Sequence, residues 1–178
     1  MIGGEGFERA RLHAELSARM VEVGTKEITE REAEAECVVT MTPEACAQLV
    51  AGTPKGDPIE AARVAGLMGV KRTPDLLPFC HPIAVTGAEV RVIPEEASGR
   101  IQVRTRVRAR DRTGVEMEAL TGAAVAALSL YDTAKAYDRA ARIDGLRLLS
   151  KAGGKSGDYT APQDDPSVHG APDPTSTL

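Results

Sequence analysis

The stretch "GRIQVRTRVRARDRTG" at residues 99–114 decides the fold, because its side chains alternate between two kinds. The apolar or small set is Ile101, Val103, Thr105, Val107 and Ala109, and the polar set between them is Gln102, Arg104, Arg106, Arg108 and Arg110. Successive side chains of a strand point to opposite faces, so the pattern predicts a half-buried antiparallel strand. The arginine row is compatible with a phosphate-binding face, but alternation alone already predicts outward charges.

The neighbouring segments predict an antiparallel sheet with helices beside it. Residues 83–95 favour a partner strand joined by a hairpin across "PEEASG". Further strands are indicated at 36–41 and about 142–151, and residues 18–29 favour a short strand and a turn. Helices are predicted over 42–52, 58–71 and 115–141. We therefore expect an α+β sandwich with the helices on one face of the sheet.

Capping residues support the first two helices, and composition supports the third. Thr42 and Asp57 are N-cap residues, each followed by a proline, and Gly52 stands just past the end of the first helix. Residues 115–141 are apolar nearly all round and rich in small side chains, which is typical of a buried, closely packed helix.

Length and composition limit the classes of protein. With 178 residues and 42% hydrophobic content, we expect one catalytic domain over 18–159, a loose segment 1–17 and a disordered, acidic and proline-rich tail 160–178. The net charge of −4 argues against a nucleic-acid partner. We see no charge-free apolar run that would span a membrane and no signal-peptide core, so we expect a cytoplasmic protein. The sparse cysteines and scattered histidines predict no metal site.

The segment "DLLPFCHPIAV" at 75–85 places a titratable pair in an oily stretch. Pro78 and Pro82 restrict the backbone on both sides of Cys80 and His81. A histidine held there can exchange a proton near neutral pH, although a hydrogen-bonded core histidine explains the segment as well.

The long helix carries charged residues at both of its ends. Glu116 and Glu118 stand at its start, where a carboxylate stabilises the helix terminus. This explains only one of them easily, because residues two apart on a helix point to different sides. Asp132 and Lys135 share a face near its end, where a structural ion pair is the alternative. Glu118 precedes Asp132 by 14 residues, which is about 21 Å along a helix. They either serve different sites or belong to a pocket built by two chains, and we favour the second.

Two glycine-containing loops could bind an anion. Residues 150–159, "SKAGGKSGDY", contain G-K-S, but position 149 is leucine, so the P-loop motif is incomplete. The glycines still allow backbone N–H groups to turn toward an anion beside Lys151 and Lys155. Lys55 stands just before the start of a predicted helix and could also bind a phosphate there. For both loops, a flexible surface turn is the alternative.

Three stretches together resemble one family. "KRTPDLLPFCHPI", "TGVEMEALTGAAVAALSLYD" and "LRLLSKAGGKSG" are similar to the cyclic pyranopterin monophosphate synthases, the MoaC family of molybdenum cofactor biosynthesis, over about Ala18 to Asp158. The resemblance implies a ferredoxin-like fold and a lyase that converts 3′,8-cyclised dihydro-GTP to cyclic pyranopterin monophosphate plus pyrophosphate. It also implies a homohexamer, a trimer of dimers with the site at the dimer interface.

The resemblance also assigns roles to residues. It implies proton transfer by Asp132, Lys135 and Lys151. It implies substrate contacts at Lys55, Phe79, Cys80, His81, Glu116, Met117, Glu118 and Lys155. No cofactor is implied, and Mg²⁺ on the triphosphate is compatible with the chemistry. The chain departs from the family pattern at Phe79, Thr133 and Ala134, but no charged pocket residue is lost. The rival interpretations are an inactive scaffold of this family and an unrelated nucleotide-binding module.

Overall fold

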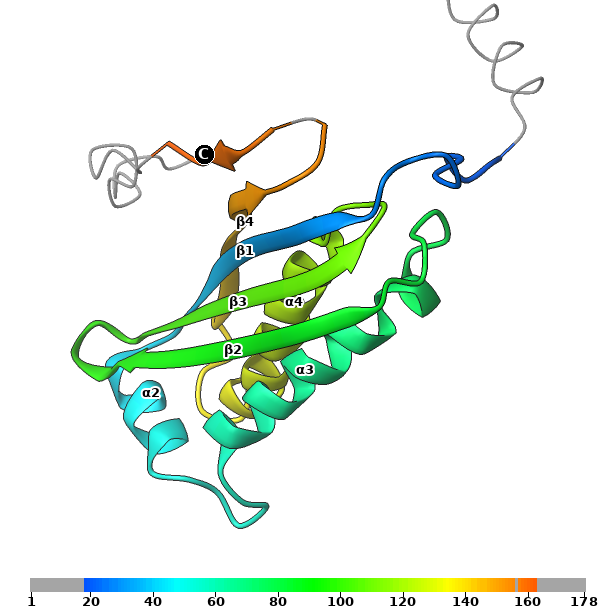
Figure 1. Cartoon of the computed structure of the whole chain (residues 1–178). Helices are drawn as coiled ribbons and strands as arrows, with labels where there is room; N and C mark the ends of the chain where they lie inside the picture. Colours follow the sequence, from blue (N-terminus) through cyan, green and yellow to red (C-terminus); the bar gives the residue numbers. More distant parts are fainter. Residues whose placement is uncertain (1–17, 156, 163–178) are drawn as a thin grey trace, which may run out of the picture.

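One antiparallel sheet is covered on a single face by helices in the computed structural model, which describes residues 18–155 and 157–162 (Figure 1). The predicted segment 1–17 and residues 163–178 of the predicted tail lie outside the described residues. In chain order the elements are β1 (Thr29–Thr40), α2 (Pro43–Val50), α3 (Pro58–Leu76), β2 (Val85–Glu95), a 3₁₀ turn (Glu96–Ser98), β3 (Arg100–Asp111), α4 (Glu116–Ala134), β4 (Arg142–Ala152) and β5 (Tyr159–Thr160).

The strand order is β2-β3-β1-β4-β5. The β2–β3 hairpin follows the first helices, and α4 then returns the chain to β4 beside β1. This is the split βαβ arrangement of a ferredoxin-like α+β fold, so the predicted fold class is confirmed.

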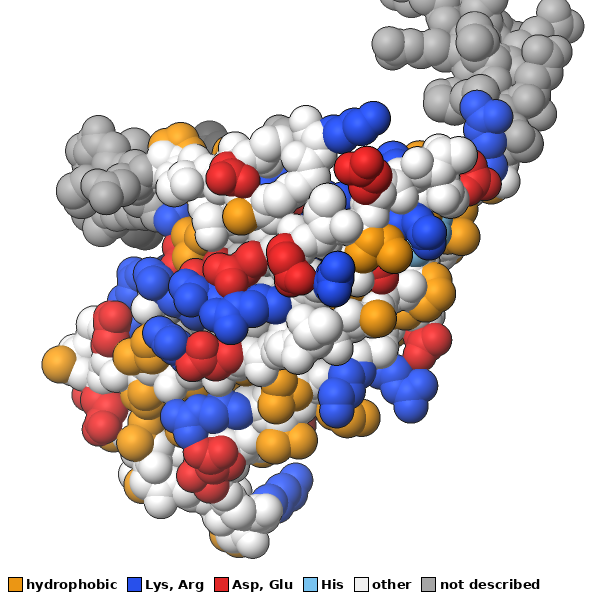
Figure 2. Space-filling view, viewed as in Figure 1, with side chains coloured by type: hydrophobic (Ala, Val, Ile, Leu, Met, Phe, Trp, Pro, Cys, Tyr) orange, Lys and Arg blue, Asp and Glu red, His pale blue; other side chains and the backbone are white. Residues whose placement is uncertain are grey.

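The alternation in 99–114 sorts side chains between the two faces of the sheet as predicted. The apolar set of β3 is fully buried toward the helices. The arginines of β3 pair with glutamates of β1, including Arg106 with Glu34 and Arg108 with Glu32, both at 2.7 Å. Figure 2 shows these basic and acidic side chains side by side over the open face of the sheet. The arginine row is therefore matched by carboxylates of the same chain.

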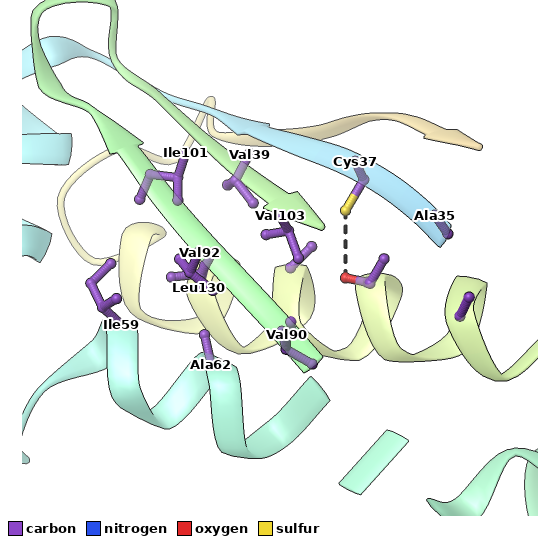
Figure 3. Packing of buried hydrophobic residues seen from close by; sticks show 14 of the residues in the cluster. Ala35, Cys37, Val39, Ile59, Ala62, Val90, Val92, Ile101, Val103 and Leu130 are labelled. Carbon is purple, nitrogen blue, oxygen red and sulfur yellow. Dashed lines mark hydrogen bonds between the residues drawn. The ribbon is translucent and has the colours of Figure 1, made fainter. Parts of the chain in front are cut away.

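The core lies between the sheet and α4, and it is made of small and branched side chains. Val39, Ile101, Val103 and Leu130 are buried there, and the Cys37 thiol donates a hydrogen bond to the Ala123 carbonyl at 3.4 Å (Figure 3). The pKa of Cys37 is raised to about 12, mainly by burial.

Helices α3 and α4 cross closely because glycines stand at the contact. A Cβ on Gly69 would lie 2.9 Å from the Val125 Cβ. A Cβ on Gly122 would lie 2.7 Å from methyl groups of Thr105 and Val70. These contacts fix the position of α4 against both its neighbour and the sheet.

Helix capping and the position of β4 agree with the sequence. The Thr42 hydroxyl accepts a hydrogen bond from the Ala45 N–H, and the Asp57 carboxylate accepts bonds from Ile59 and Glu60. Strand β4 covers the range predicted for it.

Three predicted boundaries and one predicted strand are wrong. Strand β1 begins at Thr29, seven residues before the predicted start. The sequence does not mark this start, because the first inward positions of the strand hold an arginine and alanines rather than large apolar residues. Helix α3 runs on to Leu76 through Pro74. Helix α4 ends at Ala134, after which turns lead into β4. No strand is found in 18–28, where Met20 and Val21 are exposed.

The short strand β5 closes the described part of the chain at the edge of the sheet, where Thr160 pairs with Ser150 and Tyr159 with Lys151. None of the helices in the described part of the chain has the length and apolar character needed to span a membrane.

Candidate functional site

Two pockets lie at opposite ends of α4. Glu116, Met117 and Glu118 of its first turn line one pocket, and Ser129, Asp132 and Thr133 of its last turns line the other. The helical rise separates Glu118 from Asp132 by about 21 Å. The two charged groups predicted from the sequence therefore occupy different pockets of one chain.

The pocket at the C-terminal end of α4, here called the Lys55 pocket, encloses about 440 Å³. A tight turn forms one wall, in which the N–H groups of Thr53 and Gly56 donate to each other's carbonyls at 3.0 and 2.9 Å. The Thr53 hydroxyl also accepts a hydrogen bond from the Lys55 N–H at 3.2 Å. Lys55 therefore stands at the tip of a hydrogen-bonded turn next to the start of α3. These hydrogen bonds argue against the alternative of a flexible loop.

Asp132 and Lys135 form an ion pair at the mouth of this pocket, with Nζ and Oδ1 2.6 Å apart. The hydrogen bond and charge of Lys135 lower the pKa of Asp132, with a smaller effect of Lys55, and the same pair raises the pKa of Lys135. The sequence suggested that the pair interrupts a buried helix, which is wrong: the side chains are 74% and 56% exposed. An exposed pair contributes little stability, so a purely structural role is weakened as an explanation.

The second pocket, here called the His81 pocket, encloses about 340 Å³ between the CHP segment and the start of α4. Its lining residues are Phe79, Cys80, His81, Ile83, Thr113, Gly114, Glu116, Met117 and Glu118. The Cys80 N–H donates to the Leu77 carbonyl at 3.1 Å, which turns the chain sharply after α3. His81 is only partly buried and lines a pocket wall, so it is not a core histidine.

Glu118 is the buried carboxyl group of the His81 pocket, with 2% exposure. Burial raises its pKa most strongly, and the negative charges of Glu116 and Asp111 raise it further against the opposing effect of a backbone hydrogen bond. Burial and the nearby Glu118 also raise the pKa of the Cys80 thiol. Both shifts extend the pH range of the neutral forms, which are a protonated carboxyl group at Glu118 and a thiol at Cys80.

Lys151 is not a lining residue of either pocket, but it lies beside the His81 pocket, because its Nζ is 3.3 Å from Oε1 of Glu116. The three residues expected to transfer protons are therefore divided between the two ends of α4, with Asp132 and Lys135 at one end and Lys151 at the other. Lys155 is exposed in the loop after β4 and is not among the lining residues of either pocket.

Arg31 is a neighbour of the His81 pocket that sequence reasoning missed. Its guanidinium donates to the carbonyls of Asp111, Arg112 and Gly153. Its place in the sequence could have revealed it, because Arg31 belongs to the same alternating set of inward positions in β1 as the buried Ala33 and Ala35. In the described part of the chain, no group of three or more His, Cys, Asp or Glu side chains is placed to hold a metal ion.

The fold and the pockets define a class: a ferredoxin-like α+β protein with two pockets that combine apolar surface with charged side chains, as sites for small, charged ligands do. Residues 20–154 match the MoaC family, and the chain belongs to that family.

The chain is also similar to proteins named cyclic pyranopterin monophosphate synthase. The one from Deinococcus radiodurans is 54% identical over 149 residues, which are 83% of this chain and 88% of that protein. The one from Pelotomaculum thermopropionicum is 51% identical over 141 residues, 79% of this chain and 83% of that protein. The one from Chloroflexus aurantiacus is 46% identical over 157 residues, 88% of this chain and 96% of that protein. The resemblance inferred from the three motifs is confirmed.

Proposed function

We propose that the chain is a cyclic pyranopterin monophosphate synthase that converts 3′,8-cyclised dihydro-GTP to cyclic pyranopterin monophosphate and pyrophosphate. One observation carries the proposal: a chain that matches such synthases over most of its length gathers most of the motif side chains in or beside two pockets. Closing a cyclic phosphate means that a sugar hydroxyl attacks the α-phosphorus and pyrophosphate leaves. No water enters that step, so we place the enzyme among the phosphorus–oxygen lyases.

We propose that the Lys55 pocket of one chain faces the His81 pocket of a second copy. Within the described residues of one chain, neither pocket contains both Asp132 and Lys151. The surface of α3 and α4 exposes large apolar side chains, among them Val64, Met68 and Leu128. Exposed apolar surface of this kind is typical of a protein–protein interface. A homohexamer, as a trimer of dimers, is the assembly that the family resemblance supports.

The groups of the Lys55 pocket suit the phosphate end of the substrate. The ammonium groups of Lys55 and Lys135 would neutralise charge on the triphosphate and on the departing pyrophosphate. Asp132, held ionised by Lys135, would accept a proton while Lys135 supplies one. A Mg²⁺ ion carried by the triphosphate is compatible with this scheme, which requires no cofactor bound to the protein.

The His81 pocket suits proton transfer at the ring system. Glu118 retains its proton to a higher pH than an ordinary glutamate, so it can donate one. Lys151, whose ammonium group is paired with Glu116 beside the pocket, would be the second proton-transfer group. The basic loop with Lys155 adds positive charge, the His81 imidazole offers a hydrogen bond, and the exposed Phe79 and Met117 offer apolar contact to a flat ring. We also propose that the enzyme acts in the cytoplasm, in keeping with its three free cysteines.

The test supplies the cyclised dihydro-GTP to the purified protein and measures pyrophosphate release and pterin formation together. Lys151→Ala should abolish both products while the circular dichroism spectrum stays that of the wild type. Lys71→Ala, which removes an exposed lysine of α3 outside both pockets, is the matched control and should keep full activity. Tight substrate binding without pyrophosphate from the wild type would refute the synthase and favour a scaffold. Full activity of Lys151→Ala would refute the residue assignment.

A further inference from the structure

Arg31 and Asp111 stand where the core of the sheet ends and the His81 pocket begins. Arg31 lies opposite Ala109 in the β1–β3 register, and Ala109 is fully buried on the helix-covered face. Side chains directly opposite on paired strands share a face, and Asp111 follows Ala109 by two residues on that face. Two charged residues therefore replace the apolar side chains that the inward rows would otherwise hold.

The Arg31 guanidinium joins two loops that are far apart in the sequence. Its Nε and Nη2 donate to the carbonyls of Asp111 and Arg112 at 3.4 Å, and its Nη1 donates to the carbonyl of Gly153 at 3.3 Å. Arg112 is two residues before Gly114 in the wall of the His81 pocket, and Gly153 is two residues after Lys151. One side chain thus sets the distance between two parts of the candidate site.

The glycine-rich loop is shaped to fit this guanidinium. Gly154 has φ +84°, and a Cβ there would overlap the Arg31 guanidinium. Gly153 has φ +90°, and a Cβ there would overlap the carbonyl oxygen of Glu30. The two glycines are therefore explained by close approach to β1, not by flexibility of a surface turn.

Asp111 extends the connection to the CHP segment. Its Oδ2 accepts a hydrogen bond from the Ala84 N–H at 3.3 Å, and its Oδ1 accepts one from the Arg112 N–H at 2.7 Å. Ala84 is three residues after His81. The wall formed by the CHP segment is therefore held by the same pair of residues that holds the 112–114 segment and the Gly153 loop.

We propose that Arg31 and Asp111 are positioning residues that hold two walls of the His81 pocket, and the Lys151 loop beside them, in the geometry needed for the reaction. Both residues act on backbone groups, so they place His81, Glu116 and Lys151 without touching the substrate. Lysine cannot replace Arg31, because a single ammonium group lacks the planar fork that reaches three carbonyls in different directions. The catalytic part of this inference rests on the proposed function, and the structural part does not.

The test compares Arg31→Ala, Arg31→Lys and Asp111→Ala with Arg110→Ala. Arg110 is the matched control, since it is on the opposite face of the same end of β3, is 70% exposed and lies 3.8 Å from Glu30. Hydrogen exchange followed by mass spectrometry should show faster exchange in peptides covering 112–114 and 151–155 for both Arg31 variants. Asp111→Ala should accelerate exchange in the peptide containing Ala84. Peptides of the Lys55 pocket should be unchanged in all variants.

Activity supplies the second readout. At a temperature where each variant is fully folded, kcat/KM should fall about 10- to 100-fold in both Arg31 variants and stay at the wild-type value in Arg110→Ala. Free guanidinium, added well below denaturing concentrations, should restore part of the activity of Arg31→Ala but not of Lys151→Ala. Unchanged exchange in Arg31→Lys, faster exchange with unchanged kcat/KM, or an equal loss in Arg110→Ala would each overturn the proposal. Should the wild type lack synthase activity, the exchange data alone would decide whether the two residues hold the walls.

Discussion

Mixed oligomers of two inactive variants offer the sharpest test of a site shared between two chains. Asp132→Asn disables the Lys55 pocket, and Glu118→Gln disables the His81 pocket at the other end of α4. Both substitutions replace a carboxylate by an amide of the same shape, so the fold should be preserved. Each variant alone should be inactive, because every site of its dimer lacks one of the two groups.

The expected recovery follows from the symmetry of a two-fold dimer. When equal amounts of the two variants are mixed by co-expression, about half of the dimers contain one chain of each kind, and each of these has one intact site out of two. Total pyrophosphate release should therefore reach about one quarter of the wild-type rate per chain. A pocket contained within one chain would give no recovery at all.

Mixtures of two variants that both change the same pocket are the controls. Asp132→Asn mixed with Lys55→Ala places both defects in the Lys55 pocket, so no site of a mixed dimer is intact and no activity should return. Glu118→Gln mixed with His81→Ala tests the other half in the same way. Recovery in these control mixtures, or its absence in the main one, would refute the shared pocket.

Three further predictions follow from the burial and charge of single residues. Gly122→Ala should lower the free energy of unfolding by about 1 kcal/mol, because overpacking of about 1–3 kcal/mol outweighs a gain in helix propensity of ~1 kcal/mol. Gly87→Ala, with open space around the new Cβ, should leave stability in chemical denaturation unchanged. The pKa of Glu118 is raised by burial, so its stabilising contribution is complete below the pKa of the unfolded chain and is lost as pH rises through the folded value. Glu118→Gln should therefore become more stable relative to the wild type as pH rises through that range in thermal unfolding, and a constant difference would contradict this. Thiol labelling of the native protein should modify Cys80 but not Cys37, whose pKa is about 12, and equal rates would contradict the burial assigned to them.

The sheet was predictable because its signal is local. Alternation in 99–114 depends on only one strand, and N-cap residues such as Thr42 act within a single helical turn. The start of β1 was not predictable, since Arg31 and Ala33 occupy inward positions without the large apolar side chains that mark a strand. Helix α4 was extended too far because Ala134 is followed by further good helix formers, and the turn that stops it depends on tertiary contacts such as the one between Asp138 and the Thr42 N–H.

The motifs supplied the candidate residues of the site, but not how the fold groups them. Sequence spacing placed Glu118 and Asp132 about 21 Å apart on one helix, and the two pockets agree with that. Nothing in the spacing of Lys151 indicated which end of α4 it would approach, because this depends on the pairing of β4 with β1. The role of Arg31 was hidden for the same reason, since its partners are backbone groups more than 75 residues away.

The position of the two half-pockets on α4 also restricts how two copies can meet. A two-fold axis that crosses α4 near its middle places the two copies of the helix antiparallel, so the Glu118 end of one lies beside the Asp132 end of the other. Leu128 is exposed on this stretch, and Val64 and Met68 expose apolar surface on α3. A parallel arrangement would instead place like half-pockets together, with two copies of the buried Glu118 facing each other and no Lys55 near either. The proposed reaction needs unlike halves, and the antiparallel arrangement is the symmetric one that supplies them twice.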